Sequence, residues 1–169
     1  MMPSDLDALV ELDSDPEVMR WINGGRPTGR EAWETTILPR WLAMNAASPG
    51  RGWLVAVERS APHAFVGWFH LKPGHCWPDE LELGYRLRRV VWGRGLATEG
   101  SRALLAHAFE RLGEAKVIAT TMVHNIASRR VMEKVGMRAE CEFDEERWTG
   151  GGSNRAVKFG IERGEWEVR

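Results

Sequence analysis

The sequence predicts a mixed α/β fold in a single domain that spans residues 1–169. Apolar residues recur at helical spacing before residue 48, alternate along residues 80–87 as in a half-buried strand, and return to helical spacing after residue 95. No repeat, low-complexity tract or shift of composition marks a linker. The length of 169 residues fits one domain, because domains commonly contain about 100–200 residues.

The first part of the chain is expected to be helical. One helix begins near Leu6, and a second begins at Asp15-Pro16, because proline is favoured in the first turn of a helix. A third helix is expected over residues 28–45. Pro39 is expected to kink or split this helix, since a proline in a helix interior removes a backbone hydrogen bond.

The second part of the chain combines strands with helices. A turn at Ser60-Ala61-Pro62 separates the first two strands, and a glycine-rich loop over residues 149–153 joins the last two into a hairpin. The predicted strands cover residues 53–57, 64–71, 80–87, 116–122, 138–148 and 155–161; one predicted helix follows Gly95 and another covers residues 126–135.

The composition argues against several functions. The chain has 23 basic and 24 acidic residues, a formal net charge of -1 and no basic blocks, so nucleic-acid binding through phosphate neutralisation is not expected. No apolar run approaches the roughly 18 residues of a membrane span, and the first residues do not resemble a signal peptide. Two cysteines, Cys76 and Cys141, fit a reducing compartment, so we expect a cytoplasmic protein.

The turn before the long helix carries Gly93 and Gly95, and it predicts an anion site. Backbone amides at the start of a helix bind phosphate, and the helix dipole adds to the attraction. A simple tight turn is the alternative explanation of the two glycines. A Walker loop is excluded because no lysine follows the glycines, and a dinucleotide fingerprint is disfavoured because Thr98 stands where its third glycine would be.

Two blocks of sequence resemble the GNAT N-acetyltransferase superfamily, and its RimJ/RimL-type branch most of all. Trp-Gly-Arg-Gly-Leu-Ala-Thr-Glu at residues 92–99 is similar to the acyl-CoA pyrophosphate loop, and residues 125–137 are similar to the branch's Asn-x-x-Ser…Glu-Lys-x-Gly-Phe pattern. The resemblance implies the GNAT fold, a central mixed, mostly antiparallel twisted sheet flanked by helices. That branch acetylates protein N-termini and related amines.

The chain departs from the family pattern at three places. Val90 occupies a position that often carries Gln or Arg, which matters little for a loop that binds through its backbone. The family's first strand is expected to be missing, either because the start codon is misplaced or because an edge strand has been lost. Met132 stands where many relatives place a general-acid tyrosine, so the acid role cannot be filled there.

The resemblance implies transfer of acetyl from acetyl-CoA to a primary amine in a ternary complex, without a covalent enzyme intermediate. Glu82 is the first candidate for the base, with Glu80 as the alternative. A free glutamate with a pKa near 4.3 is a poor base for an amine, so Glu82 would need burial or a relaying water; a solvated or salt-bridged glutamate is the competing interpretation. Ser128 is the candidate donor to the leaving thiolate, although a first-turn hydroxyl can simply bond backbone.

The donor is expected to bind along one strand, one loop and one helix start. The backbone of Tyr85, Arg86 and Leu87 would pair with pantetheine as an added strand does. The pyrophosphate would lie on the loop and the helix start formed by Trp92, Gly93, Arg94, Gly95, Leu96, Ala97 and Thr98. Asn125 would cap the next helix and bond the pantetheine amide with Ser128 nearby, and the side chains of Arg86, Arg89 and Arg94 could assist the phosphates.

The amine acceptor is expected between residues 21–28 and 148–153, with Trp21 and Trp148 at the mouth. It is either a protein N-terminus or a small-molecule amine. An α-amine with a pKa of about 7.7–8 is roughly one-tenth neutral at pH 7, whereas a lysine amine near 10.4 is neutral about once in several thousand molecules, so the α-amine is the easier substrate.

Three further expectations concern metals, assembly and an alternative function. No metal is expected, because His63, His70, His75 and Cys76 lack a recognised zinc spacing. The oligomeric state stays open, a homodimer included. An acyl-CoA-binding sensor or scaffold with little turnover is the alternative function, motivated by Met132 and by the missing first strand.

Overall fold

The computed structural model describes residues 1–59 and 61–167, so Ser60 of the predicted turn lies outside the described residues. Short helices occupy the first part of the chain, as predicted. They are a 3-10 turn at Pro3–Asp5, α1 (Leu6–Ser14), α2 (Pro16–Asn23), α3 (Arg30–Ala32), a π-helical segment at Trp33–Ile37, and α4 (Leu38–Ala47). Within residues 1–59 no strand precedes α1.

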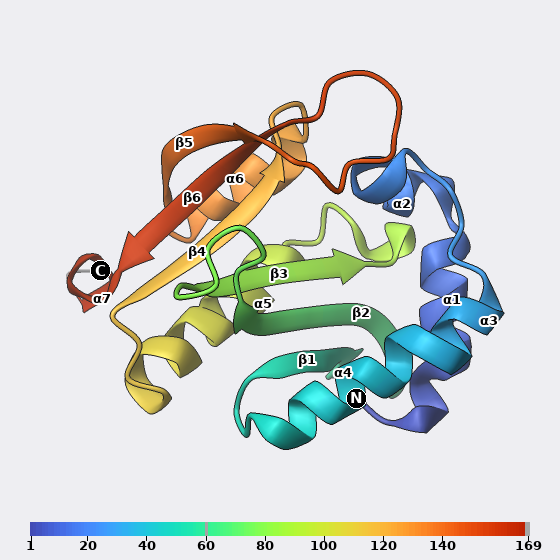
Figure 1. The fold of residues 1–169 in the computed structure, drawn as a ribbon. Helices are drawn as coiled ribbons and strands as arrows, with labels where there is room; N and C mark the ends of the chain where they lie inside the picture. Colours follow the sequence, from blue (N-terminus) through green and yellow to red (C-terminus); the bar gives the residue numbers. More distant parts are fainter. Residues whose placement is uncertain (60, 168–169) are drawn as a thin grey trace.

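Six strands form one mixed sheet in the order β1-β2-β3-β4-β6-β5 (Figure 1). All neighbouring pairs are antiparallel except β3 and β4, which are parallel. The strands are β1 (Gly52–Glu58), β2 (Ala61–Pro73), β3 (Leu81–Leu87), β4 (Lys116–Met122), β5 (Arg138–Asp144) and β6 (Arg155–Glu162). This is the mixed, mostly antiparallel α/β fold that the sequence predicts.

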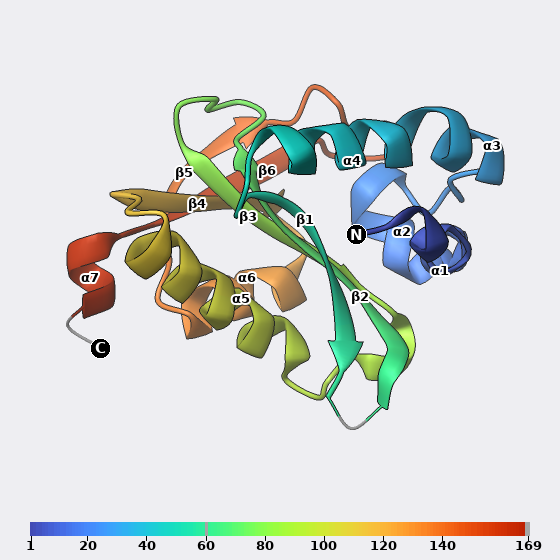
Figure 2. The same ribbon diagram turned by 90° about the horizontal axis from the view of Figure 1, so that it is seen from below.

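Helices cover both faces of the sheet. Figure 2 shows α5 (Leu96–Ala106) and α6 (Ile126–Lys134) beneath the sheet and α4 above it, with α7 (Arg163–Glu167) at one end. One core lies between the sheet and α5 and α6; it contains Leu83, Leu105 and Phe159. A second core lies between β1, β2 and the first helices, where Trp41 stacks on Trp53 at 4.6 Å.

Two predicted elements differ from the observed ones. The segment expected as one helix over 28–45 is helical from Arg30 to Ala47, but a π-helical segment at Trp33–Ile37 divides α3 from α4 just ahead of Pro39. A π-helical turn just before the proline absorbs the disturbance, with the amide of Leu38 bonded to the carbonyl of Trp33. The strand expected over 138–148 ends at Asp144, because the chain then turns and the amide of Trp148 bonds to the carbonyl of Glu145 at 3.0 Å.

Candidate functional site

The parallel strands β3 and β4 open into a V. Their register contains only Leu81 with Val117 and Glu82 with Ile118, after which the two strands diverge (Figure 1). The backbone of β3 beyond Glu82 therefore faces a gap in the middle of the sheet on its β4 side. Unpaired strand edges bind extended chains through backbone hydrogen bonds. This is where Tyr85, Arg86 and Leu87 lie, so the gap suits the predicted pantetheine contact.

The predicted anion loop lies at the start of α5. Gly93 and Gly95 have φ angles of 77° and 82°, in the left-handed region that favours glycine, and the helix begins at Leu96 with no side-chain cap. A Cβ atom added to either glycine would have no heavy atom within 4 Å, so the space over the loop is open. The first amides of a helix have no intrahelical acceptor. Amides aimed into open space are the requirement for binding a phosphate.

A hollow of about 540 Å³ continues from this helix start. It is lined by Gly95, Thr98, Glu99, Arg102 and Lys134. Arg102 donates a hydrogen bond to the carbonyl of Lys134 at 3.1 Å and links α5 to the end of α6. Neither Arg102 nor Lys134 was predicted from the sequence. Arg102 could have been, because it lies two helical turns beyond Gly95 on the same helix face.

The arginines expected to assist phosphates all have carboxylate partners. Arg94 pairs with Glu58 at 2.5 Å, and Arg89 pairs with Asp15 at 3.1 Å. Arg86 pairs with the buried Asp13, and its guanidinium lies 5.0 Å over the Trp68 ring. The expectation for the Arg86 side chain is therefore corrected: alternation along β3 turns it to the sheet face away from α5, and only its backbone remains at the V.

Trp92 lies against the loop, as expected. Its indole nitrogen donates a hydrogen bond to the carbonyl of Leu87 at 2.9 Å, which ties the loop back to the end of β3. The rest of the ring is half exposed, at 48%. The indole thus fixes the loop and leaves an aromatic surface beside the helix start.

Tyr85 and Ser128 meet across the V. The Tyr85 hydroxyl lies 3.4 Å from the Ser128 Oγ, and Asn125 caps α6 by accepting a hydrogen bond from the Ser128 amide at 3.3 Å. Burial raises the pKa of Tyr85, and the hydrogen bond to Ser128 opposes that shift. Sequence reasoning assigned only a backbone role to this residue, which is the one tyrosine of the chain. Met132, 4% exposed, is part of the apolar core.

Glu82 is buried, and each of its carboxylate oxygens has a partner. It is 8% exposed, pairs with the Lys72 Nζ at 2.8 Å, and accepts a hydrogen bond from the Thr120 hydroxyl at 2.7 Å. Burial alone would raise its pKa, but the charge and hydrogen bonds of Lys72 and Thr120 outweigh burial and lower the pKa below its usual value. Glu82 is therefore an ionised carboxylate and a weaker base than a free glutamate.

Glu80 belongs to a separate ion-pair network. It pairs with Lys116 at 2.8 Å and with the buried Lys158, and Glu140 pairs with the same two lysines at 2.7 and 3.0 Å. Burial raises the pKa of Glu80, but the two lysines together lower it below its usual value. Both candidate bases are thus held in the charged form.

His70 is a partly buried histidine on the same sheet face as Glu82, and both of its ring nitrogens are buried. Its ring stacks on Trp68 at 5.7 Å and covers Gly84, where an added Cβ would lie 2.5 Å from the His70 Nε2. Neither ring nitrogen has a hydrogen-bond partner within the described residues. Burial, together with the charges of Lys72 and Arg86 and against that of Glu82, lowers the pKa of His70 to about 3. Sequence reasoning considered His70 only as a metal ligand.

Because the pKa of His70 is lowered in the native state, we expect the fold to lose stability in acid. In the unfolded chain His70 takes up a proton near pH 6.5, whereas the native state takes it up only near pH 3, so stability is lost as the pH falls between these values. We expect His70→Phe, which keeps an aromatic ring and binds no proton, to reduce by roughly 3 kcal/mol the stability difference between pH 7 and pH 4. Urea unfolding at both pH values measures this; an equal pH dependence in both proteins would contradict it.

The two segments expected at the acceptor mouth lie side by side (Figure 1). A Cβ added to Gly24 at the end of α2 would lie 2.6 Å from the Cα of Gly150, and Arg26 donates a hydrogen bond to the Thr149 carbonyl. The Trp148 ring packs on Gly150, and its indole nitrogen is buried without a partner in the described part of the chain. Trp21, from α2, is partly buried beneath the Arg20 guanidinium.

Comparisons with known proteins agree with this fold. Residues 1–138 match the model of the acetyltransferase (GNAT) domain. FsC-acetyl coenzyme A-N(2)-transacetylase of Aspergillus fumigatus is 38% identical over 168 residues, which cover 93% of this chain and 69% of that relative. The fold, the site and these similarities define an N-acetyltransferase.

Solved structures show the same architecture. Spermidine N-acetyltransferase of Vibrio cholerae, solved with CoA and spermine, has a TM-score of 0.78 at 16% identity and covers 99% of this chain and 95% of that one. The aminoglycoside acetyltransferase AAC(6')-Ib, solved with coenzyme A, has a TM-score of 0.79 at 20% identity with the same coverage. Because the family model matches most of its length, the chain belongs to the GNAT acetyltransferase family. Among the described residues no helix is long and apolar enough to cross a membrane.

Proposed function

We propose that the chain, acting as a single domain, transfers an acetyl group from acetyl-CoA to a primary amine by direct attack in a ternary complex. The observation that carries this proposal is the V between β3 and β4, which opens beside the amides of the α5 start. A long donor with a phosphorylated end and an extended arm fits both features at once. The sequence blocks at residues 92–99 and 125–137 support placement in the RimJ/RimL-type branch.

The donor would be held along a continuous path. The pyrophosphate would lie on the amides from Gly93 to Thr98, with the cations of Arg102 and Lys134 beside it. The pantetheine arm would follow the unpaired edge of β3 at 85–87 and reach Asn125 at the start of α6. This path would end at the Tyr85–Ser128 pair, so the thioester would lie near two hydroxyl groups.

The leaving group would be protonated by this pair. The amine nitrogen attacks the thioester carbonyl carbon, the tetrahedral intermediate collapses as the carbon–sulfur bond breaks, and the thiolate takes a proton. Ser128 would donate that proton and would be replenished by Tyr85. A tyrosine hydroxyl is a stronger acid than a serine hydroxyl, so the relay supplies what Met132 cannot.

We expect Tyr85→Phe to lower kcat by about 10- to 100-fold, because general-acid catalysis contributes roughly 100-fold or more and Ser128 remains in place. The variant loses one oxygen and keeps the buried ring, so acetyl-CoA affinity should stay within about two-fold. Steady-state thiol release and CoA titration measure the two quantities. Ser128→Ala is the matched comparison, and combining the two substitutions should cost little more than Ser128→Ala alone, because Tyr85 acts through Ser128. Full activity in Tyr85→Phe would refute the relay.

Glu82 would act on the amine through water and charge. Its lowered pKa makes direct proton abstraction from an ammonium weak, but a fixed carboxylate attracts the ammonium and orders a water that accepts the proton. An acceptor that is already partly neutral suits such a site. The Aspergillus relative is named for acetyl transfer to an N(2) nitrogen, which supports a nitrogen acceptor here.

The decisive experiment is CoA release from acetyl-CoA with a panel of amines: N-terminal peptides, amino-acid derivatives, polyamines and aminoglycosides. We expect turnover with α-amines in preference to lysine-type amines at pH 7. Tight CoA binding without turnover on any amine would favour the acyl-CoA sensor or scaffold instead. The apolar Met132 and the charged Glu82, a weak base, would be consistent with that function. Absence of CoA binding would refute both functions.

Location and assembly complete the proposal. Cys76 and Cys141 are both free thiols, which fits a reducing compartment and supports a cytoplasmic location. The proposal needs no second subunit, because the residues assigned to the donor and to the acceptor mouth all come from one chain. A homodimer would be compatible with it.

A further inference from the structure

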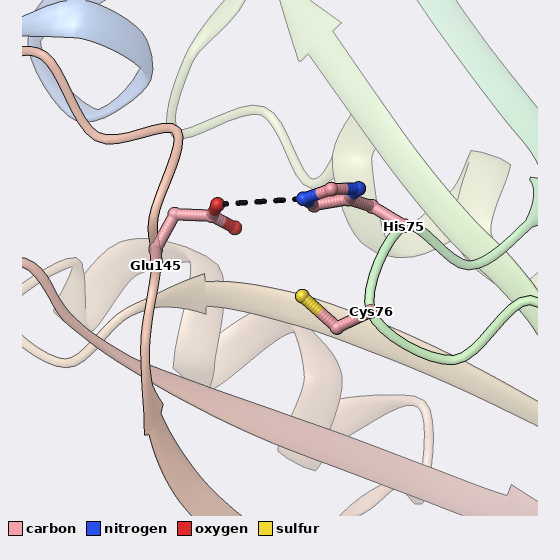
Figure 3. A group of neighbouring side chains, drawn as sticks. All are labelled: His75, Cys76 and Glu145. Carbon is pink, nitrogen blue, oxygen red and sulfur yellow. Dashed lines mark ion pairs between the residues drawn. The ribbon is translucent and has the colours of Figure 1, made fainter.

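The connection between β2 and β3 brings two ligand-type side chains to a third that follows β5. His75 and Cys76 face Glu145, and the ligand atoms of all three lie within 4.8 Å of one another (Figure 3). The His75 Nε2 is 3.8 Å from a carboxylate oxygen of Glu145. This group could not be recognised from sequence spacing, because Glu145 lies about 70 residues further along the chain, just after β5. Of the other residues weighed as zinc ligands, His70 lies elsewhere on the sheet, and the side chain of His63 lies outside the described residues.

Packing already holds the β2–β3 connection against the end of β5. The Trp77 ring meets Phe143 edge-on at 4.9 Å, which joins the residue after Cys76 to the end of β5. The Gly74 amide bonds to the Glu80 carbonyl at 2.8 Å and closes the β2–β3 connection. No metal is therefore needed to bring the three side chains into contact.

Glu145 is fixed by its own loop as well. Its amide bonds to the Asn154 carbonyl at 2.9 Å, and its carboxylate accepts a hydrogen bond from the Arg147 amide at 2.9 Å. A carboxylate that is already oriented by a hydrogen bond is the usual arrangement in metal sites. His75 and Cys76 are both exposed, so an ion can reach them from solvent.

We propose that His75, Cys76 and Glu145 bind a zinc-like divalent cation, with water in the fourth position. Imidazole, thiolate and carboxylate are the donors that zinc uses, and magnesium and calcium prefer oxygen alone. Tetrahedral coordination with bonds of about 2.0–2.3 Å separates ligand atoms by roughly 3.3–3.6 Å. Small rotations of exposed side chains therefore complete the site. On binding, the Cys76 thiol releases its proton to solvent and the sulfur becomes the ligand.

The charges around Cys76 favour a cation. The carboxylates of Glu145, Glu82 and Glu146 lie near Cys76 and outnumber the guanidinium of Arg147, so the local charge attracts a divalent cation. The ion would also join the β2–β3 connection to the loop that carries Trp148 and touches α2, so it would stiffen one wall of the acceptor mouth.

The test is a zinc titration of the metal-stripped protein against a chromophoric chelator, with cobalt(II) as a spectroscopic probe. We expect one zinc per chain and a cobalt–thiolate charge-transfer band. Cys76→Ser and Glu145→Gln should each weaken zinc binding at least about ten-fold and Cys76→Ser should remove the band. Cys141→Ser, which changes the other exposed cysteine, is the matched control and should change neither. Substoichiometric binding, or equal binding by Cys76→Ser, would overturn the proposal.

A second measurement tests whether zinc stiffens the loop after β5, which forms one wall of the acceptor mouth. Arg147 lies in the loop after β5, so limited trypsin digestion with mass spectrometry reports how often that loop opens. Zinc should slow cleavage after Arg147 several-fold in the unmodified protein and have no such effect in Cys76→Ser. Equal rates with and without zinc would refute the coupling to the loop. Neither experiment depends on acetyl transfer, so its outcome is independent of the proposed function.

Discussion

Replacing Gly95 with Trp is expected to abolish acetyl-CoA binding. Gly95 precedes α5 with a φ of 82°, and no atom lies within 4 Å of the position where its Cβ would be. An indole at this position would enter the space over the first helical amides, where the pyrophosphate is proposed to bind. Hydrogen bonds to a charged group are worth about 1.5–3 kcal/mol each, so losing two of them would weaken binding roughly 100- to 10,000-fold.

Gly95→Ala separates this blockage from backbone strain. Both variants force a side chain into the left-handed region at a cost of about 1–2 kcal/mol, but only the indole fills the phosphate space. Calorimetric titration with CoA gives the affinities, and thermal unfolding shows whether both variants are equally folded. The alanine variant should retain most of its affinity. If the tryptophan variant bound CoA as tightly as the alanine variant, the pyrophosphate site would have to lie elsewhere.

Glu82→Gln is expected to lower kcat by about 100-fold while leaving acetyl-CoA affinity nearly unchanged. This loss lies at the low end of the range for general acid–base groups, because the lowered pKa of Glu82 already limits it as a base. Glutamine keeps the shape of the side chain and can still accept the hydrogen bond from Thr120. Initial rates at saturating acetyl-CoA and acceptor measure kcat. An unchanged rate would remove Glu82 from the mechanism.

Two companion variants make this result specific. Glu80→Gln changes a neighbouring carboxylate that is also ion-paired, and it should leave kcat within a few-fold if Glu82 is the acting group. Removing the Glu82 charge also leaves Lys72 without its partner, which destabilises the fold. Lys72→Met combined with Glu82→Gln should restore thermal stability without restoring the rate. Recovery of the rate in the double variant would assign Glu82 a purely structural role.

The positions of most elements were accessible from local sequence. The strand expected over residues 116–122 is observed as Lys116–Met122, and the long helix starts after Gly95 as predicted. Periodicity and glycine conformation act over a few residues, so they can be recognised without knowing the fold. The end of β5 could not be predicted from local sequence. It depends on the last pair with β6, Asp144 with Arg155, beyond which the chain turns.

The fold class and the glycine turn before α5 thus follow from local sequence, because alternation, helical spacing and positive φ at glycine are properties of short segments. Packing alone decided which ionisable groups meet. Glu82 has its pKa lowered by Lys72, Tyr85 reaches Ser128 across the V, and Cys76 meets Glu145, each partner coming from a different element. Charges and hydrogen bonds depend on distance and burial in three dimensions, and no spacing along the chain specifies either.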